Sequence, residues 1–330
     1  MRRAAFPGVL SALLMLGVNI AASAQEPALQ TVRLIGLPGI PLPVVVGTSK
    51  GIFARFGIEV HAEKAADADA LRSTLASHGA DIAHSAAENA VVMSDSGQAD
   101  VVIVLGGETA TSELIVQPEI KSVKDLRGRT IIVDGPDTAY SQTLRKILLR
   151  NGIKPGVDCE IKVIGLAPQR LQAMQDHQEY AATLQKPPTS ILSKRAGLVS
   201  LGSTQELLNE GPAQGISGFV DRQWARQHSA LLERYIAAFI ESQRWLLAPE
   251  NKQAVIAMLM KESHLAADVA AETYEIAVNH GWTPDARFDL AGFQNTLALQ
   301  EKADTSAARL QRYYDLSYYQ RALAEADSPK

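Results

Sequence analysis

The sequence contains a single cysteine, Cys159, among 330 residues, which excludes a framework of intrachain disulfides. It also lacks a basic surplus, since 32 Lys and Arg stand against 36 Asp and Glu and give a formal net charge of −4. A chain without excess positive charge is a poor candidate for binding nucleic acid. Because 46% of the residues are hydrophobic, intrinsic disorder is excluded as well. The length predicts about two folded domains of ~100–200 residues each.

Long apolar runs are missing beyond the N-terminus, so no later transmembrane helix is predicted. At the start, Arg2 and Arg3 precede an apolar stretch over residues 9–22, and Ala22-Ser23-Ala24 fits a signal-peptidase site. These features predict a signal peptide cleaved after Ala24 and a mature, soluble protein in the periplasm. An uncleaved membrane anchor and a twin-arginine signal are the open alternatives. No cysteine lies near the cut, which argues against a lipid-anchored protein.

Recognisable catalytic or cofactor motifs are also scarce. The seven histidines are scattered without the spacing of metal ligands, and no Walker loop or dinucleotide-binding glycine pattern occurs. Cys159 is expected to be a half-buried thiol rather than a reactive one. The sequence therefore predicts a protein that is not an enzyme and that needs no metal or cofactor.

What the sequence does contain is an alternation of short apolar runs and helical patterns. Strands are predicted at residues 31–37, 58–61, 81–84, 101–105, 113–117, 130–134, 160–165, 180–184 and 216–220. Helices are predicted at residues 44–56, 68–77, 86–96, 122–126, 138–150 and 169–175, and the chain is almost entirely helical from residue 221. This order favours an α/β fold with mostly parallel sheets flanked by helices.

Two stretches rich in Gly and polar residues, 106–112 and 211–218, are typical of connections between domains. They divide the chain into a discontinuous first lobe, residues 25–105 plus 219–330, and a second lobe, residues 106–218. Two lobes joined by a pair of crossings form a central cleft that can hinge shut on a ligand.

Several segments then resemble one known family in their order along the chain. The segments are residues 43–60 (PVVVGTSKGIFARFGIEV), 75–83 (LASHGADIA), 120–130 (IKSVKDLRGRT), 149–153 (LRNGI) and 245–246 (WL). They are similar to the substrate-binding proteins of ABC importers for sulfonates, taurine, nitrate and thiamine-pyrimidine precursors. The resemblance covers essentially the whole mature chain. It implies a two-lobed periplasmic binding protein of type II, which captures a small polar molecule and delivers it to membrane permease subunits.

Some residues of these segments also suit the ends of helices. Gly51 and Gly57 suit helix ends that need positive φ, and Ser122 with Asp125 forms a variant of the capping box. The chain departs from the family at residues 177–181 (HQEYA) and at Lys186-Pro187-Pro188, both close to the expected cleft.

In open α/β sheets, ligands bind at the carboxyl ends of the strands, where helix N-termini supply N–H donors. Four loops qualify by this rule: residues 37–42, 84–89, 106–111 and 134–140. The candidate ligand-binding residues from these loops and from a fifth strand end are Pro38, Ile40, His84, Ser85, Glu88, Asn89, Glu108, Thr109, Asp134, Asp137, Thr138, Tyr140 and Lys186. Ser85 and Thr138 also suit ordinary helix N-caps, and His84 also suits a structural histidine.

The charge of the ligand stays open at this point. Glu88, Glu108, Asp134 and Asp137 outnumber Lys186, and carboxylates that point into a cleft would repel an anion. We predict a small polar organic ligand, with Glu88 or Glu108 as the discriminating group. The alternative is that all four carboxylates face solvent near helix starts.

Three alternatives to a monomeric import component stay open. A periplasmic sensor that feeds a receptor or kinase uses the same module. An exported enzyme on this scaffold is a second alternative. The third is the cytosolic thiamine-pyrimidine synthase branch of the resembled family, which relies on a cysteine-rich segment that this chain lacks.

Overall fold

The computed structural model describes residues 1, 28–110, 112–298 and 306–327. The predicted signal peptide and its cleavage site lie outside these residues, apart from Met1, and so remain a prediction. In the described part of the chain, none of the helices has the length and apolar character needed to cross a membrane.

The first sheet has five strands, each of which overlaps a predicted strand. Its order is β2 (Ile58–Lys64), β1 (Gln30–Gly36), β3 (Ile82–Ala86), β12 (Ile216–Asp221) and β4 (Val101–Leu105). β1 pairs in parallel with β2 and β3, whereas β12 runs antiparallel between β3 and β4. All five residues of β4 are buried, as a continuous β-branched run predicts. The late strand β12 therefore returns to the sheet made by the N-terminal third.

The second sheet is built from the middle of the chain. Its order is β10 (Val199–Ser203), β6 (Glu113–Val116), β9 (Tyr180–Gln185), β7 (Thr130–Val133) and β8 (Glu160–Val163). β7 pairs in parallel with β8 and β9, while β6 is antiparallel to β9 and β10. The sequence did not predict β10, nor the short ribbon of β5 (Thr109–Ala110) and β11 (Ala213–Gln214), which pairs the two segments that run between the sheets.

The predicted helices are present with differences at their ends, and the sequence did not predict the two helices at 189–195 and 204–208. The helices are α1 (Leu42–Ser49), α2 (Ile52–Arg55), α3 (Ala68–Ala76), α4 (Glu88–Ser96), η1 (Val123–Leu126), α5 (Ala139–Arg150), α6 (Ala167–Asp176), α7 (Thr189–Arg195), α8 (Thr204–Leu208), α9 (Arg222–Gln227), α10 (Ser229–Leu247), η2 (Pro249–Asn251), α11 (Lys252–Ser263), α12 (Ala267–Ile276), η3 (Ala277–Gly281), η4 (Pro284–Ala286), α13 (Leu290–Leu297), α14 (Ala307–Leu310) and α15 (Ser317–Ala326). The helix predicted over 44–56 is broken at Gly51, whose φ of 66° separates α1 from α2. The capping box of Ser122 and Asp125 is confirmed at η1.

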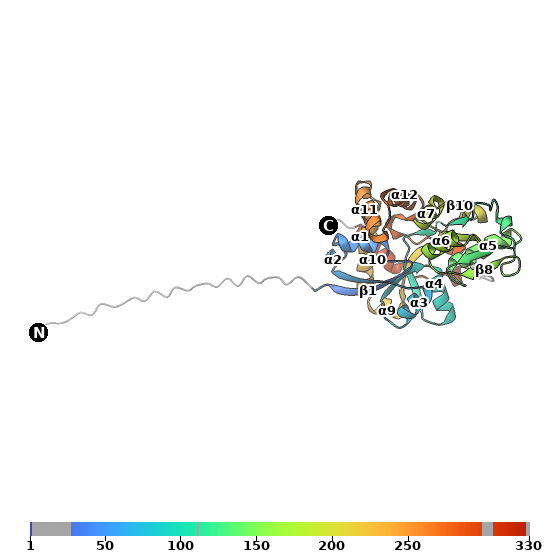
Figure 1. Cartoon of the computed structure of the whole chain (residues 1–330). Helices are drawn as coiled ribbons and strands as arrows, with labels where there is room; N and C mark the ends of the chain where they lie inside the picture. The colour runs from blue at the N-terminus through green and yellow to red at the C-terminus, as the bar shows by residue number, and fades with distance from the viewer. Residues whose placement is uncertain (2–27, 111, 299–305, 328–330) are drawn as a thin grey trace.

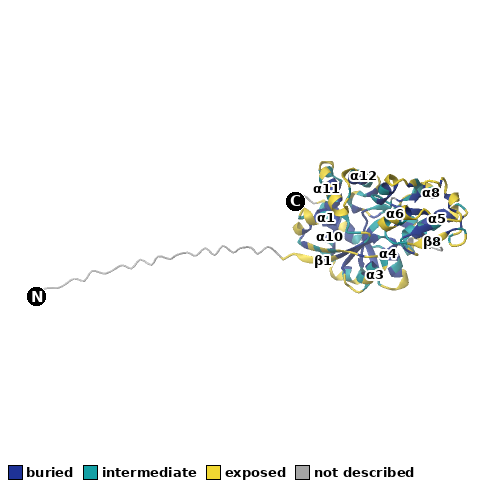
Figure 2. Ribbon diagram, viewed as in Figure 1, coloured by how far each residue is buried: buried dark blue, intermediate teal, exposed yellow. Residues whose placement is uncertain are grey.

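The core of the first sheet is organised around α10. One face of this helix is apolar, and its residues Leu232, Ile236, Phe239 and Leu246 are all buried. Tyr235 of the same helix stacks on Phe53 of α2, with ring centroids 5.4 Å apart. Figure 2 shows this buried interior continuing through the strands of both sheets.

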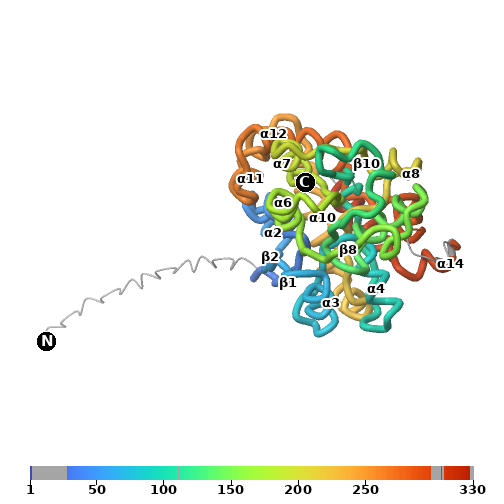
Figure 3. Tube along the Cα trace, turned by 45° about the vertical axis from the view of Figure 1, so that its right-hand side comes forward, coloured from blue at the N-terminus to red at the C-terminus, as the bar shows by residue number. Residues whose placement is uncertain are grey.

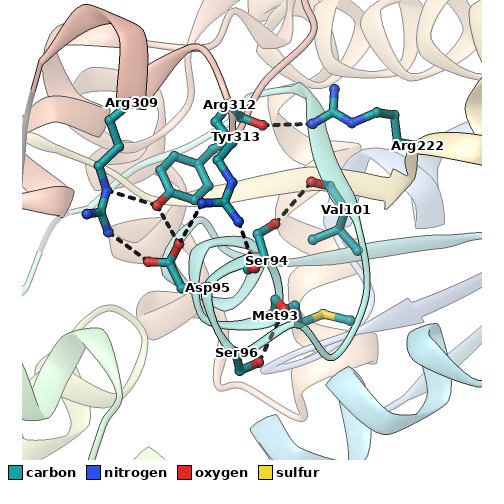
Figure 4. Close-up of polar contacts among 9 residues, drawn as sticks. All are labelled: Met93, Ser94, Asp95, Ser96, Val101, Arg222, Arg309, Arg312 and Tyr313. Atoms are coloured by element: carbon teal, nitrogen blue, oxygen red, sulfur yellow. Dashed lines mark hydrogen bonds and ion pairs between the residues drawn. The ribbon is translucent and has the colours of Figure 1, made fainter.

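The C-terminal segment is fastened to the first sheet by polar contacts around Asp95 (Figure 4). Asp95 accepts hydrogen bonds from Tyr313 Oη at 2.7 Å and from the Arg309 guanidinium at 2.8 Å. Arg312 donates to the Ser94 carbonyl oxygen at 3.1 Å. In addition, the backbone N–H of Ile103 in β4 donates to the Tyr313 carbonyl oxygen at 2.8 Å. The end of the chain thus packs on the sheet formed by its beginning.

The elements of the two sheets lie on opposite sides of the molecule in Figure 1, with α1, α2 and α10 on one side and α5, α6 and β8 on the other. Figures 1 and 3 both place α7 next to α12, where the two sides meet. Arg195 of α7 forms ion pairs there with Asp268 and Glu272 of α12. The exact lobe boundaries at 105/106 and 218/219 stay a prediction; β12, which begins at Ile216, lies in the first sheet.

Candidate functional site

A large cleft of about 1240 Å³ lies between the two sheets. Its walls come from loops at the carboxyl ends of β1, β3, β7 and β9 and from the ribbon of β5 and β11. All of the predicted site residues except His84 line this cleft: Pro38, Ile40, Ser85, Glu88, Asn89, Glu108, Thr109, Asp134, Asp137, Thr138, Tyr140 and Lys186. The strand-end rule therefore located the cleft, and contact with a ligand stays a prediction for each residue.

His84 is the predicted residue that the structure does not bring to the cleft. Side chains alternate along a strand, so His84 and Ser85 of β3 point to opposite faces of the sheet. His84 is buried against α10, where it stacks on Phe239 at a centroid distance of 5.0 Å and shares a 2.9 Å hydrogen bond with the Tyr235 hydroxyl. Burial lowers the pKa of His84 to about 3, which keeps the imidazole neutral. His84 is thus placed as a core residue.

The first-sheet wall holds a chain of hydrogen bonds among Ser85, Asn89 and Arg72. The Asn89 amide donates to Ser85 Oγ at 3.0 Å, and Arg72 of α3 donates to Asn89 Oδ1 at 2.8 Å. Arg72 also pairs with Asp69. Ser85 does not cap α4, since it lies inside β3 and Ala87 holds the N-cap position. This wall is therefore fixed by its own polar contacts.

Glu88 lies in the first turn of α4 and reaches the second-sheet side of the cleft. Its Oε1 accepts a hydrogen bond from the backbone N–H of Ala139, the first residue of α5, at 3.2 Å. A carboxylate is favourable at a helix N-terminus, and here it occupies the N–H group that an anionic ligand would otherwise use. The side chain is only 7% exposed. Burial, reinforced by the nearby Asp134 charge, raises the pKa of Glu88 to about 7 against the opposing backbone hydrogen bonds.

The start of α5 is held by Thr138, as the sequence predicted. Thr138 Oγ1 accepts from the backbone N–H of Ser141 at 3.2 Å and donates to Asp134 Oδ1 at 2.5 Å. Asp137 lies at the exposed edge of this loop, so one of the four predicted carboxylates does face solvent. The Asp134 carboxylate is half-buried beside the cleft.

Glu108 and Lys186 form an ion pair across the cleft floor. Lys186 Nζ lies 3.0 Å from Glu108 Oε2, and the two side chains are 28% and 26% exposed. Burial alone would lower the pKa of Lys186, but the Glu108 carboxylate raises it above the ordinary value. The pair neutralises one of the four predicted carboxylates, and of these four it leaves Glu88 buried and Asp134 half-buried without a cation among the described residues.

Arg170 is a cleft residue that sequence reasoning missed. It lies in α6, is 2% exposed, and donates to Thr183 Oγ1 at 2.8 Å, to the Leu184 carbonyl oxygen at 3.0 Å and to the Gly165 carbonyl oxygen. Its guanidinium carbon lies 6.0 Å from the centroid of the Tyr140 ring. A charged residue on a predicted helix usually faces solvent, so only the packing of α6 on β9 reveals this buried cation.

The Tyr140 hydroxyl and the Gln185 amide complete the second-sheet wall. Burial raises the pKa of Tyr140, so the phenol stays protonated and can donate. Gln185 Oε1 accepts from Ser193 Oγ, whereas Gln185 Nε2 is buried without a hydrogen-bond partner among the described residues. A buried donor without a partner is unusual in a folded protein. Together with Arg170, these groups give the wall unused capacity to donate hydrogen bonds.

Residues 47–51 read Gly-Thr-Ser-Lys-Gly, which matches the Gly-x-Ser-x-Gly spacing of a hydrolase nucleophile elbow. Such an elbow joins a strand to a helix. Ser49 instead ends α1, and its hydroxyl donates to the Val46 carbonyl oxygen at 3.0 Å. Cys159 is more buried than predicted and lies outside the cleft. Within the described ranges, no cluster of His, Cys, Asp or Glu is arranged to hold a metal ion.

Comparison with known proteins agrees with this architecture. A sequence model of the NMT1-like family matches residues 39–260. No curated protein sequence matches the chain. The periplasmic nitrate-binding protein NrtA from Synechocystis PCC 6803 has a TM-score of 0.74 at 15% identity, over 92% of this chain and 91% of that one.

Two further solved structures show the same likeness. The periplasmic aliphatic sulphonate binding protein SsuA from Escherichia coli has a TM-score of 0.66 at 19% identity, over 88% of this chain and 99% of its own. A protein from Bordetella bronchiseptica RB50 has a TM-score of 0.74 at 18% identity, over 90% and 98%. These matches confirm the two-lobed α/β fold and the resemblance drawn from the sequence motifs.

Proposed function

Because the chain belongs to the NMT1-like family, we propose that it is the solute-binding component of an ABC import system. It captures a small polar organic molecule in the cleft between the two sheets and delivers it to membrane permease subunits. The observation that carries this proposal is the cleft itself, whose walls come from strand ends and helix starts of both sheets. Open α/β sheets bind ligands at this position.

The arrangement of the cleft supports binding rather than chemistry. Several of its charged side chains are held by neighbours: Lys186 by Glu108, Asp134 by Thr138, and Arg72 by Asn89. His84, which could act as a general base near neutral pH, is neutral and buried on the other face of β3. The structural neighbours named as nitrate- and sulphonate-binding proteins support the same interpretation.

We further propose that the mature protein acts as a monomer in the periplasm after cleavage behind Ala24. The lobes, residues 25–105 plus 219–330 and residues 106–218, close around the ligand. All the predicted site residues except His84 take part as lining groups, with Arg170 and Gln185 added. A sensor that passes the closed form to a receptor uses the same closure, and uptake measurements separate the two roles.

A thermal-shift screen of sulfonates, nitrate, pyrimidines, amines and aromatic acids tests the binding function. A compound at 100 times its Kd adds about 2.7 kcal/mol to the free energy of unfolding. Hits are then measured by calorimetry and by uptake in cells with and without the gene. Binding together with lost uptake in the deletion strain supports import. Binding with unchanged uptake favours the sensor, and turnover of a bound compound would contradict a purely binding role.

A further inference from the structure

Two buried ionisable side chains of the cleft lack a counter-ion, and they lie on opposite walls. Buried charges in proteins are normally paired, because an isolated ion is poorly solvated in the interior. An unpaired charge that lines a cleft is therefore evidence about the molecule that enters the cleft. Glu88 of α4 and Arg170 of α6 are the two residues in question.

The Glu88 carboxylate has only backbone partners, the N–H groups of Ala139 and of Glu88 itself. None of the described Lys, Arg or His side chains forms an ion pair with it. Arg72 is the cation that acts on Glu88, and it is engaged by Asn89 and Asp69. Asp134, the other acid near Glu88, adds negative charge to this end of the cleft.

The Arg170 guanidinium has only neutral partners: the Thr183 hydroxyl and the carbonyl oxygens of Gly165 and Leu184. Over the described part of the chain, no carboxylate lies within ion-pair distance of it. Asp134 acts on Arg170 only at longer range. Lys186 is neutralised by Glu108, so Arg170 is the cation of this wall that remains available to an acid.

The two walls therefore favour opposite groups of one ligand. From the proposed solute-binding function, on which this inference rests, we infer that the ligand is dipolar. It carries an amine or another N–H-bearing group that faces Glu88, and an acidic group that faces Arg170 beside the Tyr140 ring. Such a ligand contacts both walls at once, so it links ligand recognition to closure of the lobes. A simple anion satisfies Arg170 and leaves Glu88 unpaired.

The experiment compares compounds that differ only in which charged group they carry. The matched sets are β-alanine, propionate and propylamine; 2-aminoethanesulfonate, ethanesulfonate and ethylamine; and 3-(aminomethyl)benzoate, benzoate and benzylamine. In parallel, the protein is incubated with a soluble metabolite extract, and retained compounds are identified by mass spectrometry after gel filtration.

The inference predicts that a dipolar compound binds more than tenfold more tightly than the acid-only and amine-only members of its set. It also predicts that a retained metabolite carries both groups. An acid-only compound that binds as tightly as its dipolar partner, or a retained metabolite with one group only, would overturn the inference and leave solute binding intact. No binding in either arm would overturn the proposed function and the inference with it.

Substitutions at Glu88 and Arg170 test which residue binds each end of the dipolar ligand. Glu88→Gln keeps the side-chain volume and an oxygen for the Ala139 N–H, so we expect it to weaken the dipolar compound more than tenfold and acid-only compounds less than threefold. Glu63→Gln on the exposed part of β2 is the matched control and leaves both affinities unchanged. An unchanged preference in Glu88→Gln would contradict the assignment.

Arg170→Gln is expected to reduce the affinity for the dipolar compound to that of the amine-only compound. Arg170 also fastens α6 to β9, so circular dichroism and thermal unfolding check that this variant folds. Arg170→Lys keeps the charge and supplies a second variant, for which we expect an intermediate affinity. Full affinity in a folded Arg170→Gln protein would overturn the proposed acid-binding end.

Discussion

The two walls of the cleft are built from similar parts, yet they use their polar groups differently. On the first-sheet wall, Ser85, Asn89 and Arg72 satisfy one another in a continuous chain of hydrogen bonds. On the second-sheet wall, the Gln185 amide and the Arg170 guanidinium keep donors or charge that no described side chain neutralises. The polar groups of the first-sheet wall are thus hydrogen-bonded to one another, whereas the second-sheet wall keeps groups that are available to bind a ligand.

Glu88 is the exception on the first wall, and its titration gives the largest expected effect. Burial raises its pKa from 4.5 to about 7, so the folded protein holds this proton more tightly than the unfolded chain. The contribution of Glu88 to stability is therefore fully present below pH ~4.5 and is lost as the pH rises through about 7, by up to about 3 kcal/mol in the free energy of unfolding.

Urea unfolding of wild type and Glu88→Gln between pH 4.5 and 8 measures this effect. The lowered pKa of His84 acts in the opposite direction below pH ~6.5, but it is common to both proteins and cancels in their difference. We expect the free energy of unfolding of wild type minus that of Glu88→Gln to fall as the pH rises from 4.5 to 8. A flat difference curve would show that Glu88 titrates as an exposed carboxyl.

A pair of tyrosine variants compares a hydroxyl that stabilises the fold with a hydroxyl that is available to a ligand. Tyr235→Phe removes the hydroxyl that pairs with His84 in the core and leaves a buried ring nitrogen unsatisfied. We expect a loss of about 1–3 kcal/mol in the free energy of unfolding. Tyr140→Phe removes a cleft hydroxyl without a described partner, so stability should change by less than about 0.5 kcal/mol. Equal losses in the two variants would contradict the distinction.

The sequence predicted the position of the cleft better than it predicted which charged side chains in the cleft are paired. The strands were predictable because runs such as Val101–Leu105 are β-branched and end in clear turn residues. All but one of the residues that the strand-end rule then named do line the cleft. The rule failed for His84, since the register of β3 decides which of two adjacent residues faces the cleft, and register depends on partners that lie far away in the sequence.

The burial of Arg170 and the ion pair of Glu108 with Lys186 could not be predicted from the sequence, for a related reason. Glu108 and Lys186 are separated by 78 positions and meet only when the ribbon of β5 and β11 forms beside β9. Likewise, β10 has a glycine at position 202 and partly polar faces, which weakens its alternation. Which charges in this cleft are paired therefore depends on tertiary contacts between residues that lie far apart in the sequence.

The contact between α7 and α12 gives the smallest expected effect on stability. Arg195 is exposed, and its ion pairs with Asp268 and Glu272 are screened by salt. We expect Arg195→Gln to leave the unfolding midpoint unchanged within error but to increase the radius of gyration of the ligand-free protein in low salt. X-ray scattering with Lys194→Gln as control checks this; an unchanged radius would remove this contact from lobe closure.

A crystal structure of the protein with a compound from the screen tests the central claim most directly. The account predicts electron density for the compound between the starts of α4 and α5, in contact with groups of both walls. Its N–H-bearing end should face Glu88 and its acidic end Arg170. Density outside the cleft, or contact with one wall alone, would contradict the claim that these two sheets enclose a solute.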